Sequence, residues 1–178
     1  MRYRSLLFRC LLLINYFGLI SVCLAQTPPS QRQQAERLHQ LGQTARQMLN
    51  RQQPDSAFRF AIEPGLPILA LLPDTLRAAR QFRYEMLSTQ RRLKWLNEVI
   101  PNAQNLLTIC QRANDRALAG LARRTLSMAY SDLGLYKNCI RESLTNVLAF
   151  SHPPDHDMLA RTYAVLAYAY QQLKDDTK

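Results

Sequence analysis

The sequence predicts an all-α protein built from helical hairpins, and three observations lead to this prediction. The 178 residues include only five glycines, and 47% of them are hydrophobic, a composition that favours packed helices over turn-rich β structure. Proline stands beside aspartate at several joints in the chain. A pattern of small and aromatic residues around Tyr130 returns forty residues later around Tyr170.

Residues 1–25 have the features of a signal peptide. The start "MRYRSLLFR" is basic and lacks acids, and "CLLLINYFGLISVCL" is an apolar run that is short for a membrane span of about 20 residues. Cys23 and Ala25 place small residues at −3 and −1 of a cleavage point before Gln26. Loss of the three arginines in this segment would lower the net charge from +10 to +7. The alternative is an uncleaved anchor helix.

Export has consequences for location, partners and cysteines. The protein is expected in the periplasm or another extracytoplasmic space, which argues against a nucleic-acid partner despite the basic net charge. Cys110 and Cys139 would remain after cleavage, in a compartment where disulfides can form. We interpret them instead as two small buried apolar side chains.

Residues 26–33, "QTPPSQRQ", are predicted to be a polar linker before a helical domain over 34–178. Proline is tolerated in the first turn of a helix, and aspartate caps its free N–H groups. The expected caps are Asp55, Asp74, Asp115 or its neighbour Asn114, and Asp155 together with Asp157. Glu63–Pro64–Gly65 is expected to break the second helix. The predicted helices are 31–50, 55–72, 74–93, 96–113, 115–133, 136–150 and 156–174.

The forty-residue recurrence has a mechanical explanation. Leu126, Ser127 and Ala129 correspond to Leu166, Ala167 and Ala169. Small residues let the two helices of a hairpin approach closely, and the aromatic residue fills the space where the next hairpin docks. Such a period is typical of stacked helical hairpins, because one hairpin cannot bury its apolar face alone. The residues expected in the core are Leu126, Ala129, Tyr130 and Cys139.

These residues resemble the tetratricopeptide repeats. The match is best over 115–150, weaker over 74–113, degenerate over 38–72 and partial over 156–178, where the chain ends after one helix. The resemblance implies a right-handed solenoid of stacked antiparallel hairpins whose last hairpin is incomplete. We expect either that a longer protein continues the array, which we favour, or that a partner covers the exposed face. The long repeat is similar to arrays in exported bacterial sensory and regulatory proteins.

The sequence contains no motif for catalysis. It has no glycine-rich phosphate loop, no G-x-S-x-G elbow and no H-E-x-x-H pair. His152 and His156 lie in a proline-containing joint and are interpreted as solvated loop residues. We therefore expect no enzymatic activity, no cofactor and no metal site.

The tetratricopeptide resemblance places the first helix of each hairpin along a concave groove. The positions that it assigns to this wall are Gln81, Tyr84, Ser88, Arg91, Arg92, Leu121, Arg124, Met128, Ser131, Asp132, Arg161, Ala164, Tyr168, Gln171 and Gln172. Guanidinium groups pair with carboxylates, and tyrosines offer stiff contact area. The candidate peptide-binding residues are therefore Tyr84, Arg91, Arg92, Arg124, Arg161 and Tyr168. The alternative is that the arginines only keep an exposed helix face soluble.

The functional hypothesis is an exported protein–protein interaction module that forms the N-terminal sensory part of a larger bacterial signalling protein. Its ligand would be a protein or peptide with acidic groups. The alternative is a signal-anchored structural or scaffold protein at a membrane face. Membrane attachment is expected only if the signal segment stays uncleaved or a membrane segment follows downstream.

Overall fold

A computed structural model describes residues 29–175 of the chain, with side chains over 30–174. The chain divides into two compact units, residues 1–34 and 35–178. Of the first unit the structure describes only 29–34, which form the beginning of a helix. The predicted signal peptide, 1–25, and the proposed cleavage point lie outside the described residues.

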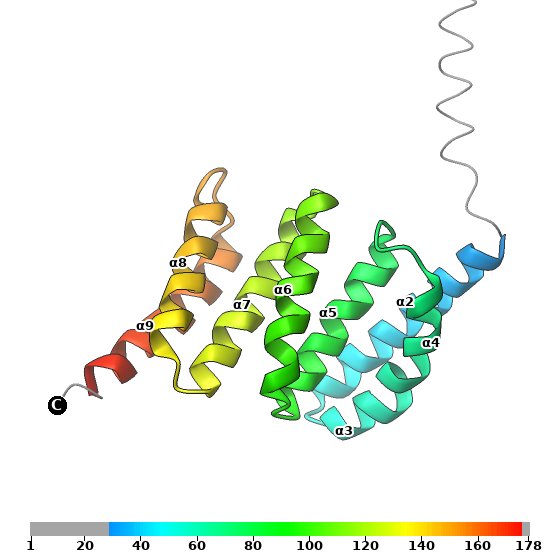
Figure 1. Cartoon of the computed structure of the whole chain (residues 1–178), viewed down its shortest axis with the longest axis horizontal. Coiled ribbons are helices and arrows are strands. Elements are labelled where there is room, and N and C mark those ends of the chain that lie inside the picture. The colour runs from blue at the N-terminus through cyan, green and yellow to red at the C-terminus, as the bar shows by residue number, and fades with distance from the viewer. Residues whose placement is uncertain (1–28, 176–178) are drawn as a thin grey trace, which may run out of the picture. The chain divides into compact units, whose positions relative to one another are not determined.

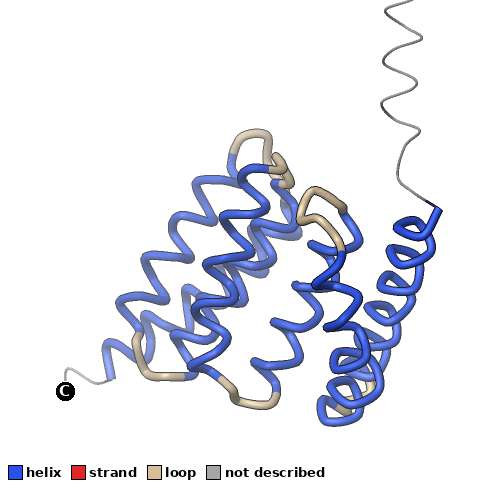
Figure 2. The backbone as a smooth tube through the Cα atoms, turned by 45° about the vertical axis from the view of Figure 1, so that its right-hand side comes forward, coloured by secondary structure: helices blue, strands red, loops and turns tan. Residues whose placement is uncertain are grey.

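The described chain is all-α, as predicted, and contains no strand between residues 29 and 175 (Figures 1 and 2). Short loops join the successive helices (Figure 2). The elements are α2 (Pro29–Asn50), α3 (Pro54–Ala57), the π-helix η1 (Phe58–Ile62), α4 (Glu63–Leu71), α5 (Arg77–Arg92), α6 (Leu96–Arg112), α7 (Arg116–Asp132), α8 (Tyr136–Ser151) and α9 (His156–Asp175).

The predicted linker 26–33 is too long at its C-terminal end, because α2 already begins at Pro29. Proline has no N–H group to lose at the start of a helix, and its fixed φ suits the first turn. The glutamines that follow are good helix formers. Polar composition alone therefore did not distinguish a linker from an exposed helix start.

The expected break at Glu63–Pro64–Gly65 is wrong, because the helical path continues from α3 through η1 into α4. The backbone N–H of Glu63 donates to the carbonyl of Phe58, five residues earlier. Such a wide turn makes room for the ring of Pro64, which in a regular α-helix would clash with the carbonyl four residues before it. The helix changes its type here and does not end.

Three turns between helices share one geometry. Lys94, Asn114 and Gly134 have φ values of 62°, 52° and 73°, and they lie twenty residues apart in the chain. The residue after each of them donates to the carbonyl five positions earlier, over 3.0 Å, 2.9 Å and 2.9 Å respectively. This left-handed C-terminal cap satisfies carbonyls that the helix leaves free. Two such turns make one forty-residue period, which agrees with the recurrence in the sequence.

Two of the predicted aspartate caps are confirmed. Asp115 accepts from the N–H of Leu118 at 3.3 Å, and Asp155 accepts from that of Met158 at 3.0 Å. Asp55 lies in the first turn of α3 but accepts no capping bond. Asp74 precedes α5 and instead accepts from Arg83 at 2.7 Å, because an arginine fork competes well for a carboxylate.

From α5 to α9, each helix of the second unit packs against its neighbours in the chain (Figure 1). α5 contacts both α6 and α7, and α7 contacts α6, α8 and α9. One apolar cluster joins α2 to α5, and another runs from α5 to α9. The predicted core is confirmed, since Leu126, Ala129, Tyr130 and Cys139 are all buried.

Both cysteines of the described region are free and buried, as interpreted from the sequence. Burial raises the pKa of the Cys110 thiol to about 11. Burial also raises the pKa of Cys139. The thiols therefore stay neutral near pH 7 and behave as small apolar groups.

Positions forty residues apart, which are equivalent in the sequence pattern, differ in their solvent exposure and in the type of side chain. Tyr130 is 7% exposed in the hairpin of α7 and α8, whereas Tyr170, forty residues later, is 50% exposed on α9. Gln90, forty residues earlier, is buried, and its amide contacts Glu98 at 3.1 Å and Asn102 at 3.0 Å. An aromatic ring and a hydrogen-bonded amide thus occupy the same place in two hairpins.

Candidate functional site

Two adjoining cavities lie along α5, α7 and α9, with volumes of about 660 Å³ and 370 Å³. Four residues line both of them: Arg91, Arg124, Met128 and Arg161. We call the combined space the arginine groove. Its larger cavity has the size typical of a ligand pocket.

All six candidate residues from the sequence line the arginine groove. Three arginines lie where the two cavities meet, Tyr84 and Arg92 line the smaller cavity, and Tyr168 lines the larger one. The other predicted wall residues that line the groove are Ser88, Leu121, Met128, Ser131, Asp132 and Ala164. The predicted wall residues that do not line it are Gln81, Gln171 and Gln172.

Helical spacing explains why these side chains meet. Arg124 and Met128 are four residues apart on α7 and therefore project from the same face. Tyr84 and Ser88 have the same spacing on α5, and α5 packs directly against α7. The groove thus forms where α5 packs against α7, although α6 lies between these two helices in the chain.

Arg124 is the unusual group in this groove. Its Nε is buried and has no hydrogen-bond partner among the described residues. Burial lowers the pKa of the Arg124 guanidinium, and the charges of Arg161 and Arg91 lower it further, while Tyr84 opposes these effects. A buried donor without a partner costs about 1–3 kcal/mol. An anion beside Arg124 would remove this cost.

The two neighbouring arginines are already paired. Arg91 donates to Asp132 at 3.0 Å, and Lys94 approaches the same carboxylate at 3.4 Å. Arg161 pairs with Asp157 at 2.9 Å, and more than half of each side chain is exposed. Exposed ion pairs contribute at most about 1 kcal/mol. A ligand anion can therefore compete for the guanidinium group of Arg161 at low cost, whereas the less exposed pair of Arg91 and Asp132 is harder to displace.

Sequence reasoning missed the part of the groove that α2 supplies. Arg46, Leu49 and Asn50 line the smaller cavity. Residues 38–72 match the repeat pattern poorly, so the sequence did not predict which residues of α2 line the groove. The buried positions Leu38, Ala45 and Leu49 on α2 could have placed Arg46 beside the apolar stripe and thus at its edge.

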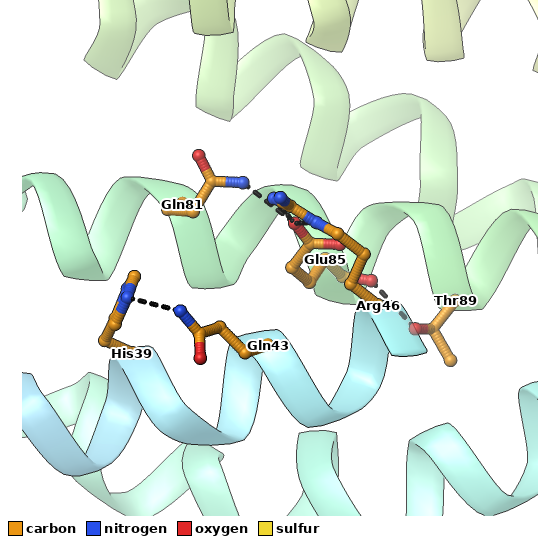
Figure 3. A network of polar contacts seen from close by, with 6 residues as sticks. All are labelled: His39, Gln43, Arg46, Gln81, Glu85 and Thr89. Atoms are coloured by element: carbon orange, nitrogen blue, oxygen red, sulfur yellow. Dashed lines mark hydrogen bonds and ion pairs between the residues drawn. The ribbon is translucent and has the colours of Figure 1, made fainter. Parts of the chain in front are cut away.

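Figure 3 shows how α2 is tied to α5 through Glu85. The carboxylate is almost completely buried and accepts from Arg46 Nε at 3.0 Å, from a second nitrogen of the same guanidinium, and from Gln81 Nε2 at 2.8 Å. Thr89 donates to the backbone carbonyl of Glu85 at 2.8 Å. Three donors satisfy a carboxylate that burial would otherwise destabilise.

The net charge of the groove is positive. Five arginines and two acids line its two cavities. Arg46 is held by Glu85 and Arg91 by Asp132. Neither Arg92 nor Arg124 belongs to an ion pair within residues 29–175. The arrangement therefore favours an anionic ligand.

Residues 29–175 offer no site for metal chemistry. No group of three or more histidine, cysteine, aspartate or glutamate side chains there could hold a metal ion. His152 and His156 are exposed. Between residues 29 and 175, none of the helices combines the length and apolar character needed to cross a membrane.

No protein-family model matches the sequence, and a search of curated proteins finds no match. The function is therefore inferred from the groove itself.

Proposed function

We propose that the protein is an interaction module that binds an extended, acidic segment of another protein in the arginine groove. One observation carries this proposal: the buried Nε of Arg124 has no hydrogen-bond partner among the described residues. Arg124 lines both cavities of the groove, where a ligand could supply that partner. A carboxylate would supply the missing acceptor and reduce the repulsion from Arg91 and Arg161.

The finer architecture belongs to the same proposal. We take the second unit to be a right-handed solenoid of tetratricopeptide type, with an incomplete last hairpin. Two observations support this: turns of one geometry recur at twenty-residue spacing, and α5, α7 and α9 contact one another in succession. Such arrays present a continuous binding surface along one set of helices.

Replacement of Arg124 by alanine is expected to weaken binding at least several-fold, and by up to about a hundredfold. A charge-assisted hydrogen bond contributes about 1.5–3 kcal/mol, less where water screens it. The partner is to be captured from an extracytoplasmic extract and then titrated against purified protein at low and high salt. The salt dependence should flatten in the variant, because one screened charge pair is lost.

Arg112→Ala provides the matched control, since Arg112 is exposed on α6 and does not line the groove. It removes the same charge and should change affinity by less than about twofold at physiological salt, where distant charges are screened. Equal binding by the Arg124 variant and the wild type at both salt concentrations would show that the groove is not the site. The arginines would then only keep the surface soluble.

We further propose that the module is exported and serves as the sensory front of a larger signalling protein. This rests on the signal-peptide pattern of residues 1–25 and the small residues Cys23 and Ala25. The expected mature N-terminus is Gln26, and N-terminal sequencing of the protein recovered from cells measures it directly. Recovery of intact Met1 in the membrane fraction would favour the anchored scaffold instead.

A further inference from the structure

The two ends of the arginine groove differ in chemistry, and this difference restricts the ligand further. The inference rests on the proposed peptide-binding function and concerns which peptides the groove selects. The larger cavity extends from Arg124 towards α8 and α9, and the smaller one extends towards α2.

The end of the groove at α9 carries aromatic and aliphatic side chains together with the polar Ser131 and Asp132. Tyr136, Ala164, Val165 and Tyr168 line it beside the shared Met128. The acid at this end, Asp132, is held by Arg91 and Lys94. Tyrosine rings and a flexible methionine are well suited to pack against a large apolar side chain.

The end of the groove at α2 is polar. Arg46 and Glu85 occupy it as a pair, with Asn50, Ser88 and Arg92 beside them. Tyr84, Leu49 and Leu121 also line this end, but they lie among charged and amide groups. A strongly apolar side chain would have to displace water from those groups without replacing their hydrogen bonds.

Arg124 lies between these two ends and also lines the larger cavity together with Tyr168. Arg124 and Tyr168 thus share one cavity of about 660 Å³. Side chains two positions apart in an extended peptide lie on the same face, roughly 7 Å from each other at about 3.3 Å per residue. An anion on Arg124 and an apolar side chain near Tyr168 can therefore come from neighbouring positions of one peptide.

We infer that the groove selects peptides in which an acidic group lies within two residues of an aromatic or large aliphatic side chain. The acidic group occupies Arg124, and the apolar side chain packs between Met128 and the tyrosines of the α9 end. The carboxylate can be that of an aspartate or glutamate side chain or that of a peptide C-terminus. Both sources offer the same planar acceptor to the guanidinium.

Selection from a random-peptide display library on the immobilised protein tests this directly. The expected result is an enrichment of peptides that combine the acid with the apolar residue at the stated spacing. A selected peptide is then synthesised in four forms: unchanged, with the acid replaced by its amide, with the apolar residue replaced by alanine, and with its C-terminus amidated. The last form distinguishes a terminal carboxylate from a side chain.

Two protein variants connect the peptide groups to the groove. Tyr168→Ala should weaken binding of the unchanged peptide about tenfold. It should have little effect on the affinity for the peptide that already lacks its apolar side chain. Arg124→Gln should likewise lower the affinity only for the peptides that keep the acidic group. Such selective coupling is the signature of a direct contact. Tyr163→Ala is the control, because Tyr163 is 51% exposed on the same helix and does not line the groove.

The possible failures are distinguishable. Recovery of no binding peptide would overturn both the peptide-binding function and this inference. Peptides that lack the paired acidic and apolar residues, or that respond equally to the Tyr168 and Tyr163 variants, would overturn the inference alone. In that outcome, loss of binding in the Arg124 variant would still support the proposed function.

Discussion

Tyr130→Ala is expected to lower the free energy of unfolding by about 3–5 kcal/mol, the range found for large aromatic side chains removed from a core. Tyr130 is 7% exposed and belongs to the apolar cluster that joins α5 to α9. Loss of its ring leaves a cavity beside α7. Because α7 also contacts α6, α8 and α9, it cannot shift to fill the cavity without disturbing those helices. Chemical denaturation followed by circular dichroism measures the effect.

Tyr170→Ala is a control supplied by the repeat itself. The two tyrosines occupy equivalent positions forty residues apart, but Tyr170 is 50% exposed. Its loss should cost less than about 1 kcal/mol, as for other surface substitutions. Similar losses in the two variants would contradict the assignment of Tyr130 as the residue on which α7 and α8 dock.

Phe82→Ala is expected to cause a loss of similar size, about 3–5 kcal/mol. Phe82 is 1% exposed on α5, and its ring packs directly on the backbone of Gly65 in α4. A Cβ at Gly65 would lie only 2.2 Å from Phe82 Cζ. The ring therefore fills the space that the glycine leaves open, and alanine at position 82 would empty it. A shift of the urea midpoint at unchanged m-value gives the loss in stability.

Phe60→Ala provides the comparison within the same region, since Phe60 is 65% exposed on η1. We expect its effect to stay within about 0.5 kcal/mol. If Phe82→Ala were as mild, the packing of α4 against α5 would contribute little to folding. α4 would then be only loosely attached to α5.

The sequence determined the helices and the core for reasons that act over short distances. Apolar and small residues at helical spacing predicted the burial of Leu126, Ala129 and Tyr130, which the structure confirms. Proline and aspartate located the joints to within a few residues. These signals can be read locally because capping, turn geometry and the helical period each involve residues close together in the chain.

Local reading failed where two local rules competed. Pro64 predicted a break, yet a wide π turn in η1 kept the helix continuous. The predicted first helix begins at residue 31, two residues late, because Pro29 already belongs to α2. In both places, the helix accommodates the ring and the missing N–H group of the proline. Composition alone does not reveal whether it can do so.

The tetratricopeptide resemblance in the sequence also predicted the six candidate residues together on one wall, and all six line the arginine groove. Only the tertiary structure decided how their charges combine. Arg46 pairs with Glu85 across 39 positions and Arg91 with Asp132 across 41, whereas Arg124 has no such partner among the described residues. The physical reason is that ion pairing depends on distances of a few ångströms between helices. The sequence fixes the type and face of each side chain, and the packing of the helices sets those distances.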